Sequence, residues 1–201
     1  MYLYISFFEW LLHSQVMHGN PDILCRFPFV GEYLAQTARS HLAHHRQVQM
    51  NMRFDDTYQT DQFRWIEVII FVLLTFLLLV PLTRFGAVKL IGGSVIIAML
   101  YGFLWNHIHN QMHESKGIVK WTKGPSNFLP PFYVTHGWYQ RLLKHHSIHH
   151  LQKGSKYNFN IIFLGCDWLM NTLKKNDCYD NTDYCKKEQD HRCQQSVKRC
   201  L

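Results

Sequence analysis

The chain has 201 residues, a formal net charge of +7 and 14 histidines, and 47% of its residues are hydrophobic. This length allows one domain with a core of its own, and nothing in the composition indicates a second. The positive charge is not gathered into a stripe of Lys and Arg with interleaved aromatic residues, so no nucleic-acid partner is expected and a membrane surface is favoured.

The first twelve residues, MYLYISFFEWLL, are apolar and aromatic. As a helix they would extend about 18 Å, which is too short to cross a bilayer alone. They have neither a basic start nor a small-residue cleavage site, so a secretory signal peptide is not expected. An interfacial helix and the end of a span that begins outside this chain both stay open.

Two groups of histidines come next. His13 and His18 are five residues apart, which places them about 140° apart around an α-helix. This pair therefore needs a bend to reach a common site. His41, His44 and His45 have the i, i+3 and i+4 spacing that puts side chains on one helix face. The second group thus presents several imidazoles to one point.

Two apolar runs follow, at residues 65–82 (WIEVIIFVLLTFLLLVPL) and residues 86–105 (GAVKLIGGSVIIAMLYGFLW). Roughly 20 apolar residues cross a bilayer core as a helix, so the runs predict a transmembrane hairpin; a buried hairpin in a soluble core is the less favoured alternative. Basic residues are frequent on both outer sides of the hairpin, whereas its turn and borders contain Arg84 and Lys89. The positive-inside tendency therefore places both ends of the hairpin in the cytosol.

Two more groups with helix-face spacing follow the hairpin: His109 with His113, and His146 with His149 and His150. Residues 114–144 connect them and are rich in aromatic residues and prolines, as in an interfacial segment, with a lid over a substrate tunnel as the alternative. Residues 174–201 are polar and contain Cys178, Cys185, Cys193 and Cys200. We expect a mobile tail with reduced thiols after one membrane domain over residues 1–173, with metal binding or lipidation as alternatives.

Ten histidines in these groups are too many for one ion. A structural zinc is closed by four ligands, and a catalytic zinc keeps three and an open position, so ten imidazoles predict two metal ions. Neutral nitrogen ligands suit iron, zinc, copper or nickel. A metal-storage tract is disfavoured because the groups are separated along the chain and by the hairpin.

The segments FFEWLLHSQVMHG, HLAHHRQ, LWNHIHNQMHES and LLKHHSIHHLQKGSKYNFN, followed by Asp167 and Trp168, resemble the successive histidine boxes of the fatty acid hydroxylase and sterol desaturase superfamily. The resemblance extends over about residues 7–172, and it includes the order of the boxes and the hairpin between the second and third. It implies an all-α integral membrane protein, in which a transmembrane hairpin carries a cytosolic helical cap with the histidine boxes.

The resemblance also implies an activity: an O2-dependent oxidoreductase that uses two iron ions to hydroxylate or desaturate a fatty acyl, sphingolipid or sterol substrate. Zinc can replace iron in a purified form. The electron donor would be a b-type cytochrome or a ferredoxin, and the location the endoplasmic reticulum or a prokaryotic cell membrane. The implied metal ligands are His13, His18, His41, His44, His45, His109, His113, His146, His149 and His150. Auxiliary candidates are Glu9, His107, His136 and His145, of which Glu9 stands one turn before His13 and could orient a ligand ring.

Two alternatives stay open. The His18-Gly19 pair and the compact size are similar to carotenoid ring hydroxylases of the same superfamily, whereas Tyr157-x-Phe159 is closer to the fatty acid branch. An alternative of another class is a non-catalytic, zinc-binding membrane protein that has kept the boxes.

Overall fold

The computed structural model describes residues 2–48, 63–79, 86–113, 135–151 and 156–175. Within these ranges the regular structure is helical and no β-strand occurs, which confirms the all-α prediction. The chain divides into two compact units: residues 1–58 with residues 132–201 form the first, and residues 59–131 form the second. Residues 176–201, which contain nearly all of the predicted tail, lie outside the described part.

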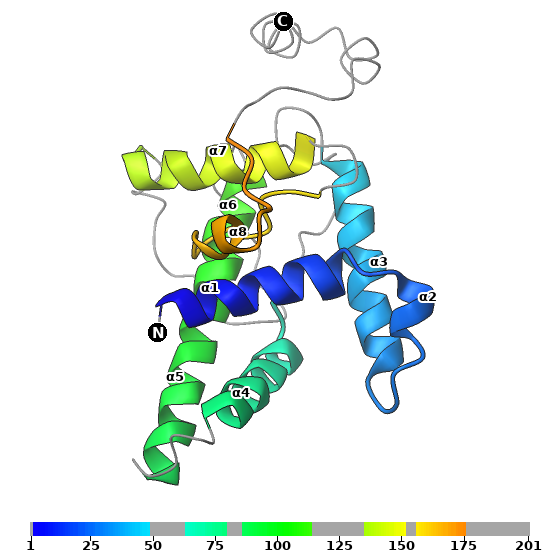
Figure 1. The fold of residues 1–201 in the computed structure, drawn as a ribbon, viewed down its shortest axis with the longest axis vertical. Coiled ribbons are helices and arrows are strands. Elements are labelled where there is room, and N and C mark those ends of the chain that lie inside the picture. Colours follow the sequence, from blue (N-terminus) through cyan, green and yellow to red (C-terminus); the bar gives the residue numbers. More distant parts are fainter. Residues whose placement is uncertain (1, 49–62, 80–85, 114–134, 152–155, 176–201) are drawn as a thin grey trace, which may run out of the picture. The chain divides into compact units, whose positions relative to one another are not determined.

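The first unit contains the N-terminal helices and the last two. Its elements are α1 (Tyr2–Leu11), the π-helical turn η1 (Leu12–Met17), α2 (Pro21–Leu24), α3 (Gly31–Gln47), α7 (Gly137–Leu151) and α8 (Cys166–Leu169). Helix α1 continues directly into η1, η1 packs on α3, and α8 packs on α1 (Figure 1). Trp10, Phe159 and Cys166 form a buried apolar cluster in this unit, so the segment after α7 is fixed against α1.

A tight hairpin joins α2 to α3. Asn20 caps α2 by accepting a hydrogen bond from the Asp22 backbone N–H at 2.9 Å, and Pro21 supplies a favourable first helical residue. A Cβ atom on Gly31 would lie 2.5 Å from the Cys25 carbonyl oxygen, so the close approach of the backbones requires glycine there. The hairpin thereby fixes the start of the helix that carries the second histidine group.

Replacing Gly31 with alanine is expected to lower the free energy of unfolding by about 1–3 kcal/mol, because the methyl group would meet backbone atoms that cannot rotate away. Gly137→Ala is the matched control, since a Cβ atom there would have nothing within 4 Å. That substitution should be neutral or stabilise the protein by up to about 1 kcal/mol. Thermal unfolding in detergent measures both, and an unchanged midpoint for Gly31→Ala would show that the hairpin is looser in solution.

The second unit consists of α4 (Trp65–Leu79), α5 (Ala87–Leu104), the π-helical turn η3 (Trp105–His109) and α6 (Asn110–His113). Helices α4 and α5 pack along each other (Figure 1), with Phe71 stacked on Tyr101 at a ring-centroid distance of 5.1 Å. The Asn106 side chain bonds both the N–H and the carbonyl of Phe63, and its amide lies 2.8 Å from that carbonyl. The start of α4 is thereby joined to η3.

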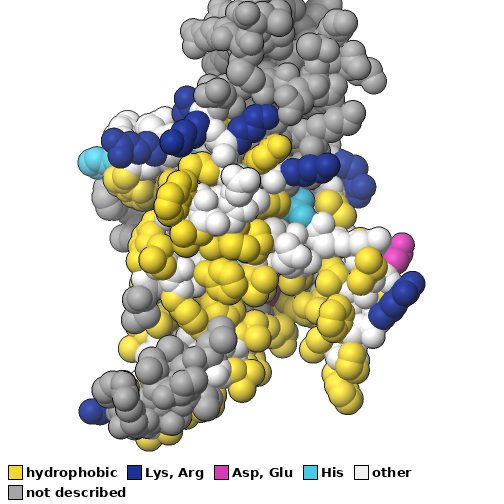
Figure 2. All heavy atoms as spheres, viewed as in Figure 1, with side chains coloured by type: hydrophobic (Ala, Val, Ile, Leu, Met, Phe, Trp, Pro, Cys, Tyr) yellow, Lys and Arg dark blue, Asp and Glu magenta, His cyan; other side chains and the backbone are white. Residues whose placement is uncertain are grey.

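One helix in the described residues is long and apolar enough to cross a membrane, namely Ala87–His113, which runs through α5, η3 and α6. The apolar helix Trp65–Leu77 is shorter, and residues 80–82 of the first predicted span lie outside the described part. Large apolar side chains cover the outside of both helices (Figure 2): Ile66, Ile69, Leu73 and Leu77 on α4, and Val88, Ile91, Val95, Ile96 and Leu100 on α5. An apolar surface of this kind suits lipid, and the transmembrane orientation stays a prediction.

Candidate metal centre

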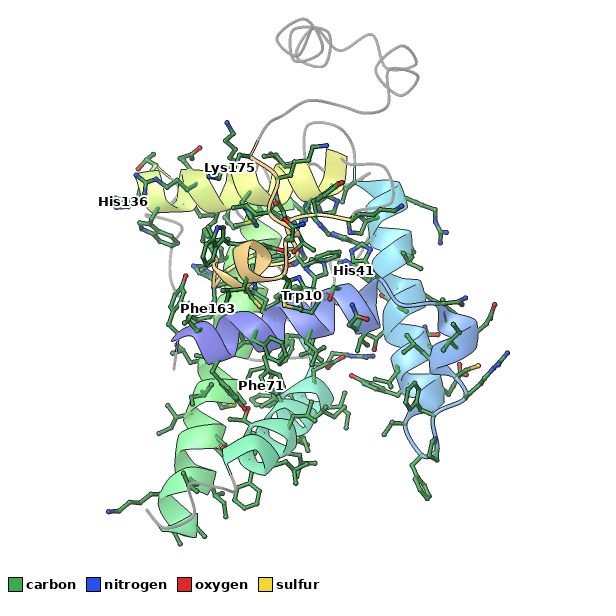
Figure 3. The ribbon with its side chains drawn as sticks, viewed as in Figure 1. Trp10, His41, Phe71, His136, Phe163 and Lys175 are labelled. Atoms are coloured by element: carbon green, nitrogen blue, oxygen red, sulfur yellow. The ribbon has the colours of Figure 1, made fainter. Side chains whose placement is uncertain are left out.

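Five histidines of the first unit bring their Nε2 atoms together. We call them cluster 1: His13 in η1, His18 just after it, His41 and His45 on α3, and His149 on α7. Their ligand atoms all lie within 4.8 Å of one another, and His41 projects from α3 toward the end of α1 (Figure 3). Neighbouring Nε2 atoms are 2.9 Å apart for His13 and His41, and 3.1 Å apart for His18 and His41, His18 and His149, His41 and His45, and His45 and His149.

These separations are those of a single coordination shell. A metal–imidazole bond of about 2.0–2.1 Å, with neighbouring ligands at right angles, places their nitrogens about 3 Å apart. The His13 Nδ1–H donates to the Phe159 carbonyl, and the His149 Nδ1–H donates to the Tyr157 carbonyl at 2.7 Å. A neutral imidazole carries one N–H, so both Nε2 atoms present lone pairs to the centre of the cluster. Lone pairs that converge in this way suit a cation between them.

Burial keeps His13, His18, His45 and His149 neutral. Loss of solvation is the main cause that holds the pKa of His13 well below its ordinary value, and the nearby His149 is the second cause. Burial lowers the pKa of His149 to about 3. The pKa of His18 and that of His45 are also lowered, again first by burial. Metal ions bind the neutral form of histidine, so the cluster is ready for a metal at neutral pH.

The turn η1 explains how His13 and His18 reach one point. The His18 backbone N–H donates to the His13 carbonyl at 3.0 Å, which is the i to i+5 bond of a π-helix. The wider turn brings the two rings to a centroid distance of 5.1 Å, although the α-helical geometry expected from the sequence would separate them. A Cβ atom on Gly19 would lie 2.3 Å from the Gln15 carbonyl oxygen, so the chain can leave this turn only through glycine.

A second group in the first unit, cluster 2, consists of His44, His146 and His150. The Nε2 atom of His150 is 3.3 Å from that of His44 and 3.1 Å from that of His146. Consecutive residues on one helix point about 100° apart, so His44 and His45 serve different clusters, as do His149 and His150. The rings of His45 and His150 stack at a centroid distance of 4.2 Å, which places the two clusters side by side.

The second unit holds the remaining predicted ligands. His109 and His113 are buried, and their rings lie 4.9 Å apart between centroids, as expected for i and i+4 on one helix face. Trp105 packs on His109 at 4.6 Å. His107 is also buried, with its ring stacked on Phe103.

The model of the family described as fatty acid hydroxylase matches residues 1–172. The chain belongs to the fatty acid hydroxylase family. The resemblance seen in the histidine boxes is thereby confirmed, and the family is membrane-associated and usually iron-dependent. Comparison with curated proteins and with solved structures gives no significant match.

The auxiliary candidates of this fatty acid hydroxylase family member have separate surroundings. His136 is exposed and lies at the N-terminal end of α7 (Figure 3). His149 lies in the last turn of that helix. His145 is buried, and its Nε2–H donates to Asp167 at 3.1 Å.

Glu9 is also buried and accepts from the backbone N–H groups of Ile162 and Phe163, each at 2.9 Å. Burial raises the pKa of Glu9 to about 7, against the effect of these hydrogen bonds. Glu9 thus fixes the segment that follows α7.

The sequence did not assign roles to Asn158, Asn160 and Asp167, which are all fully or nearly fully buried. Asp167 was part of the quoted family pattern, but nothing in that pattern gave its partners. The available signal was the alternation of Asn158 and Asn160 around Phe159 in an otherwise apolar stretch, because buried polar side chains are nearly always hydrogen-bonded.

Proposed function

We propose that this protein is an O2-dependent lipid hydroxylase or desaturase that holds two iron ions in its histidine clusters. The observation that carries the proposal is cluster 1, where five imidazoles direct Nε2 atoms at one point with spacings of 2.9–3.1 Å between neighbours. Membership of the fatty acid hydroxylase family supports the same reaction class. Bound iron would supply the O2 chemistry needed to oxidise an unactivated C–H bond.

One ion would be held by cluster 1. The second ion would be held by cluster 2, which consists of His44, His146 and His150, and the family pattern implies that His109 and His113 are metal ligands as well. The spacing of 3.1–3.3 Å among the members of cluster 2 supports a second site of the same kind. The chain's contribution is to hold the imidazoles of cluster 1 together and, at His13 and His149, to direct the Nε2 lone pair inward.

A non-catalytic zinc protein is the weaker candidate. Structural zinc is satisfied by four ligands, whereas cluster 1 offers five nitrogen ligands to one point. Imidazole ligands suit iron as well as zinc, and iron can also bind O2, so membership of a family that is usually iron-dependent favours iron.

The substrate in this proposal is a membrane lipid of the fatty acyl, sphingolipid or sterol class. Its support is the apolar outer surface of α4 and α5, which suits contact with lipid chains. We further propose a b-type cytochrome or a ferredoxin as electron donor, and a location in the endoplasmic reticulum or a prokaryotic cell membrane with the clusters on the cytosolic side.

Reconstitution with iron tests the function. The purified protein, loaded anaerobically with ferrous iron, should contain close to two irons per chain and should oxidise lipid only with both O2 and an electron donor. Lipid profiles of cells that express the protein identify the product, and labelled O2 distinguishes hydroxylation, which retains the label, from desaturation, which does not. If only zinc binds and ferrous iron never restores turnover, the protein is not an oxygenase.

A further inference from the structure

Residues 157–160 present two backbone carbonyls to cluster 1. The Tyr157 carbonyl accepts from His149 and the Phe159 carbonyl accepts from His13, in each case from Nδ1–H. A carbonyl oxygen can only accept, so each contact fixes the proton on Nδ1 and the lone pair on Nε2. The Phe159 ring also packs against His13, His18 and His149, with centroid distances of 5.6–5.8 Å. This short segment therefore orients ligands from two different elements, η1 and α7.

The Asp167 carboxylate fixes this segment. Its Oδ1 accepts from the Phe159 N–H at 2.9 Å and from the Thr172 hydroxyl at 2.7 Å. Its Oδ2 accepts from the Asn160 N–H at 2.8 Å and from His145 Nε2–H at 3.1 Å. Four donors thus surround one carboxylate that is only 1% exposed.

The peptide group between Phe159 and Asn160 links Asp167 to a cluster histidine. This peptide is trans, so its N–H and its carbonyl point in opposite directions. The N–H donates to Asp167, and the carbonyl accepts from His13. The position of the carboxylate therefore determines where the acceptor for His13 lies.

Asn158 completes the support from within the segment. Its φ of 57° lies in the left-handed region, which asparagine tolerates better than most residues. Its side chain accepts from the Lys174 N–H at 2.7 Å and donates to the carbonyls of Lys174 and His145, at 3.0 and 3.2 Å. These contacts fix the residue that lies between the two carbonyls.

We propose that Asp167 is a positioning residue of cluster 1, which holds the Phe159 and Tyr157 carbonyls so that His13 and His149 keep their Nε2 lone pairs directed at the metal. The proposal rests on the metal-binding role of cluster 1 proposed above. It concerns that cluster alone, so removing the Asp167 charge should act on one of the two ions.

Asp167→Asn is the test. The amide has nearly the same shape, but one carboxylate oxygen becomes an NH2 group, so a backbone N–H of Phe159 or Asn160 loses its acceptor and the segment must shift. Loss of such outer support lowers metal affinity by about 10–100-fold. We expect ferrous iron, and zinc used as a redox-inert probe, to leave cluster 1 about 10–100-fold faster in the presence of a chelator, while the second ion leaves at the wild-type rate.

Glu9→Gln is the matched control. Glu9 is also a buried carboxylate that accepts from two backbone N–H groups, but these belong to Ile162 and Phe163, and its contact with the segment 157–160 is a long one of 3.4 Å from the Asn160 side chain. This variant should accelerate release from cluster 1 far less than Asp167→Asn does, even if its thermal stability falls. Asn158→Gly, which permits the left-handed φ without the side-chain contacts, should accelerate release from cluster 1 less than Asp167→Asn does.

The outcomes separate the two proposals. If Asp167→Asn releases both ions at wild-type rates, Asp167 does not position cluster 1. The same conclusion follows if both ions leave faster by the same factor and the thermal stability of the variant falls to match. If Asp167→Asn fails to fold, Asn158→Gly decides the same question by the same release assay. If the wild type itself binds no more metal than its His13→Ala variant, cluster 1 is not a metal site and the proposed function fails.

Discussion

The His149→Ala variant is expected to lose the metal of cluster 1 and at least 99% of its lipid-oxidising activity, that is, about 100-fold or more. His149 is fully buried, and its Nε2 lies 3.1 Å from those of both His18 and His45. It is the ligand that α7 contributes to this cluster. Truncation would leave four imidazoles around the point and would deprive the Tyr157 carbonyl of its donor.

This effect is measured by the metal content per chain, together with product formation in the presence of O2 and an electron donor. The control is His191→Ala, which removes a histidine beyond the residues that match the family. It should keep both the metal and the activity. Equal activity of the two variants would mean that cluster 1 is not the site of the reaction.

The metal-free protein is expected to lose stability steeply as the pH falls from about 7 to 5. Histidines in the unfolded chain take up protons near their ordinary pKa of about 6.5, whereas the lowered pKa values of His13 and His149 keep them neutral in the folded protein. The unfolded state therefore binds more protons below pH 6.5, so the free energy of unfolding decreases as pH falls. Between pH 6.5 and 5 the loss is about 2 kcal/mol for each such buried histidine.

Glu9 opposes this trend. Its pKa of about 7 in the folded protein is above the ordinary value, so the folded state takes up this proton first and gains stability as pH falls toward 5. One carboxyl group does not outweigh the several histidines of cluster 1. The Glu9→Gln variant lacks the opposing effect and should show an even steeper loss in acid.

Thermal unfolding of the chelator-treated protein between pH 5 and 8 tests this expectation, with the metal-loaded protein measured beside it. The loaded protein should be more stable at pH 7, because an ion that binds the folded state alone adds its binding free energy to folding. An unfolding midpoint that does not change between pH 5 and 7.5 would show that the folded protein accepts protons on these histidines.

The sequence predicted the histidine groups well because their spacing follows from the α-helix. The i and i+4 pairs, His41 with His45 on α3 and His146 with His150 on α7, do share a cluster, whereas the i+3 residues His44 and His149 each join the other cluster. The apolar runs do form the paired helices α4 and α5. The π-helical turn η1 was not predictable, because nothing in LHSQVM distinguishes an i to i+5 bond from the usual i to i+4 bond. His13 and His18, whose spacing of five residues requires a bend, reach cluster 1 through this turn.

The roles of Glu9 and Asp167 were hidden for a different reason. Glu9 binds the backbone of residues 153 and 154 positions further along the chain, and no local pattern encodes such a contact. Neither could the sequence sort neighbouring histidines into clusters, since that depends on how α3 and α7 face each other. His136 was a candidate by residue type alone, and its exposed position just before α7 separates it from the cluster.

Cluster 1 also has a topological effect, because it joins His45 to His149, which are 104 positions apart. An ion bound there would act as a cross-link that closes a loop of that length, and the loop contains every residue of the second unit. Closing so long a loop restricts the unfolded chain in the same way as a disulfide does. Unlike a disulfide, this link can form in a reducing compartment, and a chelator rather than a reductant would open it.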